Sequence, residues 1–530
     1  MELSSLLHDL HLSSSLEKPL PFPPPPPITE LLSRVQEKLI GASSDSEPSA
    51  LIGRVERLFK TADPDWLFSA NQAEGGWAEL QAAYSSLVGA LIGRAALPLC
   101  EDDCSALPAS AYQSVPSRAE PVCSALSALL GTLGNAGCRT GLLLAVAAPV
   151  CVFAVTHFQD QAWTSSSSRT AAQSLQGALL RAGGWRDSSH LLMGEEGEEG
   201  GRRGLVGGVL DVLQPQLTKN SWQRCEAVKL VFAWTLLQVT RPSLSPHLSR
   251  LLPPSLLLND HYRSENCILG VRCLHHIVLH TPAADLRQFN RAEVLYQALF
   301  KHLYTSETAV IQPVLSCLLD LLVVLERPPS SLGPAPSRRT SCLHDRVLRL
   351  VLTHMEAEQK VELRRVYAAA LPPLIDRMGV AVCRHLRQVE RVVLGYLEVR
   401  DPPEETSRLR VLEVLQKTTR AAWPRMACRV AALLRCLCKL LVDVSSDDEL
   451  VASVRRTMME QTSLCLHLLD GCCHADLQRV LQQVDSSCCS SEVLNCLATV
   501  TSTSCRRADK QEVETFPSSD SDLTHKLFTV

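Results

Sequence analysis

The chain has 530 residues, of which 46% are hydrophobic and only 5% aromatic, and its formal net charge is −4. Leucine and alanine are abundant, and such a composition favours helices packed on helices over sheets, which prefer β-branched and aromatic residues. The weakly negative charge excludes a global basic field that attracts nucleic acid, so nucleic-acid binding would need a local patch.

The 21 cysteines do not indicate a disulfide framework. Several of them, such as Cys267 and Cys317, fall within apolar helical stripes. The chain also opens with Met-Glu-Leu-Ser-Ser, which lacks the basic and apolar regions of a secretory signal. We therefore expect reduced thiols in a protein of the cytoplasm and nucleus.

Residues 1–26 are expected to form a disordered Pro-rich leader, whose prolines could alternatively dock a proline-reading domain. N-terminal helical repeats are predicted over residues 27–193, with a loop at residues 101–121. The most apolar run, residues 141–155, contains Pro149 and is shorter than the roughly 20 residues that span a bilayer. We interpret this run as a buried core helix.

Residues 194–204 are acidic and Gly-rich, and we interpret them as a flexible loop between two halves of the chain. They contain no G-x-x-x-x-G-K-[ST] motif and follow no strand, so they do not indicate a phosphate-binding loop. C-terminal helical repeats are predicted over residues 205–500, and residues 501–530 are expected to form a disordered tail.

The clearest repeat signature lies in residues 264–320. Thr281-Pro282 is expected to end one helix and allow the next to begin, and Asn290 is predicted to cap a third, with Glu293 as its reciprocal partner. On a helical wheel, the first helix places apolar residues on one broad side: Cys267, Ile268, Gly270, Val271, Leu274, Ile277 and Val278.

Prolines divide the region that follows. Residues 328–339 are predicted to be a linker, and Pro372-Pro373 is expected to separate a helix at residues 358–371 from one at residues 379–399. Trp423-Pro424 is expected to start a later helix. Its apolar stripe repeats at threes and fours and consists of Val430, Leu433, Leu434, Leu437, Leu440, Leu441 and Val444.

Strand signals are nearly absent, and helix pairs of roughly 40–47 residues indicate about eight to ten units of the HEAT or armadillo kind. The predicted fold class is all-α: an α-solenoid of HEAT/armadillo-like helical repeats with disordered termini. This prediction rests on helix length and spacing, because no repeated motif aligns the units.

Two groups of cysteines and histidines are possible zinc ligands. Cys273, His276 and His280 share one helical side as C-x₂-H-x₃-H, but no fourth ligand is near them in the sequence. The second group lacks the usual C-x₂-C spacing and consists of Cys472, Cys473, His474, Cys488 and Cys489. Chance clustering in helices explains both groups, so we predict no metal ligand.

The sequence contains no G-x-S-x-G, H-E-x-x-H, G-x-G-x-x-G or Walker motif. We therefore predict no enzyme activity and no cofactor.

Arg384, Arg387 and Arg391 are the candidate partner-binding residues. They share one predicted helix face, and Arg364 and Arg365 lie on a neighbouring helix. Together they could form a basic ridge that binds an acidic partner or a phosphorylated segment. The alternative is a solvated face whose charge is offset by nearby acidic residues.

Several long stretches resemble the TELO-two-interacting protein two family. They are residues 231–242, 265–279, 282–286, 290–296 and 391–399, with residues 150–157 and 163–164 farther upstream. The likeness is specific because long ungapped runs agree rather than one short motif.

This resemblance implies a subunit of the Triple T complex that binds the two other Triple T subunits, themselves helical-repeat proteins. It implies a non-catalytic adaptor to the ninety-kilodalton heat-shock chaperone and its RuvB-like ATPase partner complex. Such an adaptor promotes maturation and stability of phosphatidylinositol-3-kinase-related kinases, and hence DNA-damage and growth signalling. No nucleic acid or membrane is expected as a partner. We expect the region after Pro328 to be the main docking surface.

A helical-repeat transport or trafficking adaptor is the main alternative, and a zinc- or nucleotide-dependent enzyme is a distant third. Pull-down with mass spectrometry separates them, because a transport GTPase or coat components would replace the Triple T subunits and kinases.

Overall fold

The computed structural model of the protein describes residues 26–41, 46–69, 75–100, 107–135, 140–194, 204–329, 342–481 and 489–500. Within these ranges the chain forms α-helices and short 3-10 helices and no β-strand. The predicted all-α class is confirmed. Almost all of the predicted leader, acidic loop and tail lies outside the described residues.

The chain divides into two compact units. Unit 1 comprises Met1–His261 and Arg272–Asp285, and unit 2 comprises Tyr262–Val271 and Leu286–Val530. The division falls within α13 (Ser264–His280) rather than at residues 194–204. The reason is that α7 and α9, before the acidic loop, contact α10 and α11 after it.

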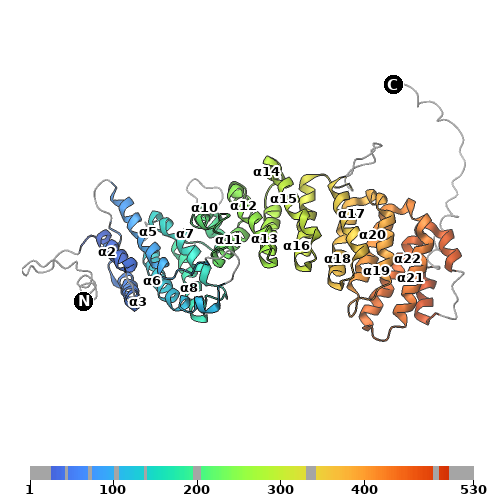
Figure 1. Ribbon diagram of the computed structural model, residues 1–530, viewed down its shortest axis with the longest axis horizontal. Helices are drawn as coiled ribbons and strands as arrows, with labels where there is room; N and C mark the ends of the chain where they lie inside the picture. Colours follow the sequence, from blue (N-terminus) through green and yellow to red (C-terminus); the bar gives the residue numbers. More distant parts are fainter. Residues whose placement is uncertain are drawn as a thin grey trace, which may run out of the picture. The chain divides into compact units, whose positions relative to one another are not determined.

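Unit 1 is built from helix pairs that stack in two layers (Figure 1). One layer contains α2, α5, α7 and α10, each in contact with the next, and the other contains α3, α6 and α8. The helices are α2 (Ile28–Gly41), α3 (Ser46–Thr61), α4 (Pro64–Leu67), α5 (Gly76–Arg94), α6 (Val115–Asn135), α7 (Thr140–His157), α8 (Ser166–Gly183), α9 (Ser188–Met193), α10 (Val206–Leu213), α11 (Glu226–Gln238) and α12 (Leu248–Asn259).

Unit 2 repeats this arrangement. One layer contains α17, α19 and α21, and the other contains α16, α18, α20 and α22, with contacts along each layer and between the members of each pair. After α14 (Ala283–Arg287), the helices are α15 (Arg291–Phe300), α16 (Thr308–Leu325), α17 (Leu343–Ala357), α18 (Val361–Met378), α19 (Leu386–Leu397), α20 (Thr406–Ala422), α21 (Val430–Ser445) and α22 (Ala452–Leu481). Residues 491–500 form a final helical segment. Such stacking is the helical-repeat architecture that was predicted.

The apolar stripes explain why these helices pack. Every predicted stripe residue of α21 is buried, and α8 begins with a capping box in which the Ser165 hydroxyl accepts from the Ser168 backbone N–H. Both features follow from local spacing, and the stripe of α21 was predicted correctly.

Helix α7 is the predicted core helix, and 61% of its residues are buried inside the protein. By length and composition alone, α7, α16 and the segment Val361–Arg384 could each cross a membrane. In α7 the apolar residues instead contact α5, α8, α10 and α11 within unit 1.

Three predictions that involve proline were wrong. Helix α18 runs through Pro372 and Pro373, and α6 includes Pro121 although a loop was expected there. A proline inside a helix removes one backbone hydrogen bond, but burial of neighbours such as Leu371 and Leu374 stabilises the continuous helix. Trp423 and Pro424 begin the 3-10 turn η8 (Trp423–Arg425) instead of α21.

The predicted cap at Asn290 was also wrong. Asn290 adopts a left-handed conformation with φ 55°, and its side chain makes no capping hydrogen bond. A capping residue needs extended backbone to aim its side chain at the first turn. Glu293 instead accepts a hydrogen bond from Gln297 Nε2 at 2.9 Å.

Candidate partner-binding surface

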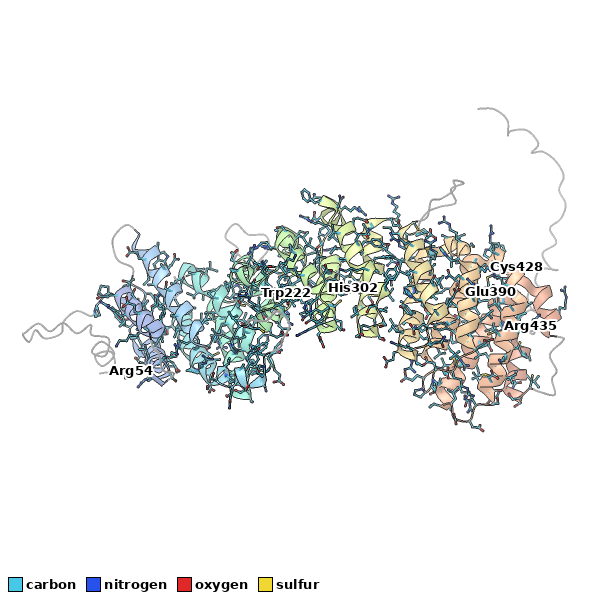
Figure 2. All side chains as sticks on the ribbon, in the orientation of Figure 1. Arg54, Trp222, His302, Glu390, Cys428 and Arg435 are labelled. Carbon is cyan, nitrogen blue, oxygen red and sulfur yellow. The ribbon has the colours of Figure 1, made fainter. Side chains whose placement is uncertain are left out.

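Ion pairs join equivalent helices of successive repeats in unit 2. Asp345 of α17 accepts from Arg384 Nη1 at 2.6 Å, and Glu356 pairs with Arg391 at 3.0 Å. One repeat further on, Glu390, which is labelled in Figure 2, pairs with Arg429. Because both ends of α17 pair in order with the η7–α19 segment, α17 and α19 run in the same direction.

Asp345 is the centre of one such contact between successive repeats. Its side chain is buried and also accepts from His385 Nε2 at 2.8 Å, while it forms a capping box with Cys342 at the start of α17. Burial alone would raise the pKa of this carboxyl. The hydrogen bonds from His385 and Cys342, together with the charge of Arg384, outweigh burial and hold the pKa below its usual value.

Arg364 and Arg365 also bond within the fold. The Arg364 guanidinium is buried and lies 3.8 Å from the centroid of the Tyr396 ring. Arg365 Nε donates to Asp401 Oδ1 at 2.7 Å, and this hydrogen bond raises the pKa of Arg365. Both residues therefore join α18 to the next repeat.

Arg384 lies in η7 (Gly379–Arg384), just before α19, and its charge is used by Asp345. Arg391 remains largely exposed although it pairs with Glu356. Arg387 is exposed and, in the described part of the chain, forms no ion pair. The three predicted residues thus have different surroundings, and their role in partner binding stays a prediction.

Two further arginines, on α17, add to the exposed positive charge of Arg387 and Arg391. Arg346 and Arg349 are exposed, and neither forms an ion pair with any described residue, although the Arg346 guanidinium lies 4.5 Å from the centroid of the Phe300 ring. Gln388 Nε2 donates to Thr353 Oγ1 at 3.1 Å. The part of α17 around Thr353 therefore lies beside the start of α19, close to Arg387. We call Arg346, Arg349, Arg387 and Arg391 the basic outer face.

The sequence analysis missed Arg346 and Arg349. A signal was present, because Val347, Leu348, Val351 and Leu352 define the buried side of α17. The two arginines, three positions apart, lie opposite that side.

The first zinc candidate is not formed. Cys273 is fully buried, and burial raises the pKa of its thiol to about 12. His276 Nε2 donates to the backbone carbonyl of Val239 at 2.7 Å, so this nitrogen has no lone pair to offer a metal. Of the second candidate, Cys473, His474 and Cys488 have side chains outside the described part of the structure.

In the described ranges, one other group of possible ligands lies together: Glu326, Cys342 and His344, with ligand atoms within 4.8 Å of one another. His344 Nδ1 donates to Glu326 Oε1 at 2.6 Å, and the Cys342 thiol caps α17. These bonds connect the end of α16 to the start of α17. The sequence analysis missed the group because the linker separates Glu326 from Cys342.

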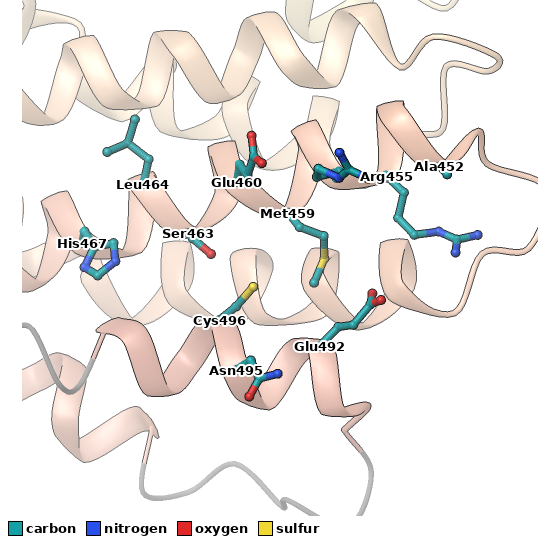
Figure 3. A pocket seen from close by; sticks show the side chains of 11 residues that line it. Ala452, Arg455, Met459, Glu460, Ser463, Leu464, His467, Glu492, Asn495 and Cys496 are labelled. Carbon is teal, nitrogen blue, oxygen red and sulfur yellow. The ribbon is translucent and has the colours of Figure 1, made fainter.

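A cavity of about 610 Å³ lies between α22 and the segment 491–500 (Figure 3). Its titratable residues include Glu460, His467 and Glu492, and no hydrogen bond or ion pair joins these three described side chains. Glu460 and His467 are two turns apart, roughly 10 Å along the helix, and Figure 3 shows Glu460 pointing away from the segment 491–500. This arrangement does not bring an acid and a base together.

A second cavity, of about 390 Å³, lies in unit 1 between the end of α5 and helices α7, α10 and α11. Its lining is apolar except for a few groups such as His157, whose Nδ1 is buried without a hydrogen-bond partner. Burial lowers the pKa of His157 to about 4, so this imidazole is neutral near pH 7.

The stacked helix pairs of both units define a class: a helical-repeat protein. A sequence model of the Tti2 family matches residues 210–400. TELO2-interacting protein 2 of Mus musculus is 40% identical over 487 residues, which cover 90% of this chain and 93% of that protein. The Homo sapiens protein of the same name is 46% identical over 351 residues, 66% of this chain and 68% of that protein. The chain belongs to the Tti2 family, as its resemblance implied.

Solved structures with similar folds include karyopherins. A Kap95p structure concerned with RanGDP is 11% identical, with a TM-score of 0.46, and covers 91% of this chain and 64% of that one. Kap121p bound to Nup53p is 12% identical, with a TM-score of 0.40, and covers 96% of this chain and 48% of that one. At these scores neither likeness bears on function.

Proposed function

We propose that this chain is a non-catalytic scaffold that binds a TELO2 partner within a multi-subunit complex. The observation that carries the proposal is membership of the Tti2 family, with curated relatives named as TELO2-interacting proteins. The helical-repeat fold supports it, because stacked helices offer extended surfaces for large protein interfaces.

The complex we propose is the Triple T complex, with its two other helical-repeat subunits as direct partners. In this function the chain supports maturation and stability of phosphatidylinositol-3-kinase-related kinases, with the kinases and the heat-shock chaperone machinery reached indirectly. Cytoplasm and nucleus are the proposed sites of action. The likeness of long stretches of this sequence to the family supports these assignments.

The first test is affinity purification of the tagged full-length chain from cells, with quantitative mass spectrometry. TELO2 is expected among the most enriched proteins. Enrichment of a transport GTPase or coat components in place of TELO2 would contradict the proposal.

We further propose that the basic outer face contributes to partner binding. Its arginines are exposed, and three of the four form no ion pair with described residues, so an acidic partner surface would be complementary. The double variant Arg349→Glu/Arg387→Glu is expected to weaken TELO2 capture by about tenfold at low salt and less at high salt.

The matched control is Arg181→Glu/Arg224→Glu, which makes the same charge change on exposed residues of unit 1. Capture by this variant is expected to stay within about twofold of the wild type, because surface charges away from an interface contribute little. Equal losses in both variants would attribute the effect to net charge and reject the basic outer face.

A further inference from the structure

An exposed aromatic side chain stands at the corner between α14 and α15. Phe289 lies in the 3-10 turn η4 (Gln288–Asn290), and its side chain is 84% exposed. Its backbone is left-handed, with φ 53° and ψ 29°, and the next residue, Asn290, is also left-handed. For a bulky aromatic residue this conformation is uncommon and costs free energy.

Elsewhere in the described chain, left-handed backbone outside glycine occurs at Glu405. Glu405 is 2% exposed, and its carboxylate accepts from the Asp401 backbone N–H at 3.1 Å and pairs with Arg408. Those buried contacts offset its strain. Phe289 makes no comparable contact with the described residues: the Arg291 guanidinium lies 5.1 Å from its ring centroid. The fold therefore gains little from the ring.

The corner that carries Phe289 is held firmly within unit 2. Leu286 and Ala292, on either side of it, are buried. Arg287 Nε donates to the carbonyl of Val324 at 2.6 Å and so ties the corner to the end of α16. A ring presented from a fixed backbone loses little conformational entropy on binding.

We propose that Phe289 is an anchor that inserts into an apolar pocket, with carboxylates at its rim, on a protein partner. Aromatic anchors that fill pockets dominate many interfaces. Arg287 and Arg291 flank Phe289 and lie two residues nearer to it in the chain than the acids Asp285 and Glu293. Because the Arg291 guanidinium also lies 5.1 Å from the ring centroid, an acidic rim on the partner is favoured. Exposed Val294, in the first turn of α15, adds apolar surface. A lipid surface fits less well, because membrane-binding segments bury a whole apolar helix face rather than one ring.

This proposal rests on the proposed scaffold function and names a contact within it. The first experiment compares Phe289→Ala with Trp423→Ala in the tagged full-length chain, because Trp423 is another exposed aromatic residue of unit 2, 60% exposed. Apparent affinity for TELO2 is measured from capture over a dilution series. Phe289→Ala is expected to weaken binding by roughly thirtyfold, as loss of an interface hot spot does, and Trp423→Ala by less than about twofold.

The thermal unfolding midpoint of both variants should match the wild type, since neither ring is buried. Retention of wild-type affinity by Phe289→Ala would overturn the anchor and leave the scaffold function standing. If the wild-type chain captures no TELO2, the scaffold function itself fails.

A second experiment identifies what the ring touches. Phe289 is replaced with the photoreactive p-benzoyl-phenylalanine in the full chain, and Trp423 is replaced in the same way as a control. Irradiation in cells is expected to give a protein adduct at position 289, mapped to apolar residues with Asp or Glu beside them. No adduct above the control, or binding of the wild-type chain to phosphatidylcholine vesicles containing phosphatidylserine that Phe289→Ala abolishes, would overturn the proposal.

Discussion

At the scale of single residues, Arg384 and Arg387 show how neighbours decide the use of a charge. The Arg384 guanidinium binds the buried Asp345 carboxylate, so removing it would leave a buried acid without its arginine partner, held only by His385 and Cys342. Arg387 is exposed and forms no ion pair with described residues, so its charge is available to another molecule. A variant of Arg384 would report on folding, whereas a variant of Arg387 reports on binding.

His157 provides a prediction at this scale. The folded-state pKa is about 4 and the ordinary value 6.5, so below pH 6.5 the unfolded chain binds a proton that the folded chain does not. The free energy of unfolding therefore decreases as the pH falls from about 6.5 to about 4, and the decrease reaches on the order of 2 kcal/mol by pH 5. In His157→Leu this loss should disappear. Urea unfolding followed by circular dichroism near pH 7 and pH 5 measures the difference, and an unchanged pH dependence would contradict it.

At the scale of secondary-structure elements, α18 shows that packing can hold a helix across two prolines. Pro372 is buried, but Pro373 is exposed, and each removes a backbone hydrogen bond from the helix. The helix continues because its apolar side, including Leu371, Leu374 and Ile375, is buried. The same balance allows Pro121 within α6 and Pro313 within α16.

We predict that Pro373→Ala stabilises the protein by about 1–2 kcal/mol. The alanine restores an N–H to the helix, and this gain exceeds the added entropy of the unfolded chain. Denaturant unfolding measures the change, with Pro328→Ala, outside the helices, as a control expected to stay within about 0.5 kcal/mol. A decrease in stability would show that the proline ring itself is needed for packing.

At the scale of the whole molecule, each repeat contacts its neighbours in the stack. The stability of such a protein is close to a sum of repeat and nearest-neighbour terms, so a local defect stays local. Unit 1 and unit 2 each possess their own stacked layers.

Asp345→Asn tests this locality. The amide keeps one acceptor oxygen but loses the negative charge that Arg384 and His385 share, which should destabilise unit 2 by about 2–3 kcal/mol. Because the pKa of Asp345 is lowered, the lost contribution is present above the ordinary value of 3.8 and absent in stronger acid. Hydrogen exchange should accelerate in α16–α19 and remain unchanged in α2–α8. Faster exchange in α2–α8 would indicate cooperative unfolding of the whole chain.

The sequence by itself determined the helical class and the buried sides of helices such as α13 and α21. These properties depend on spacings of three and four residues, and a helix brings such residues together by its own geometry. The capping box of α8 is likewise local. The residues that carry the family resemblance were also recognisable from the sequence alone.

Only the tertiary structure decided which arginines form ion pairs within the fold and which stay available to a partner. It also decided where a proline can lie inside a continuous helix. Arg384 lies 39 residues from Asp345, and Arg365 lies 36 residues from Asp401, so no local pattern connects them. Phe289 is exposed at a corner that turns left-handed between the buried Leu286 and Ala292. Such features depend on contacts between neighbouring repeats, and these contacts form only when the helices stack.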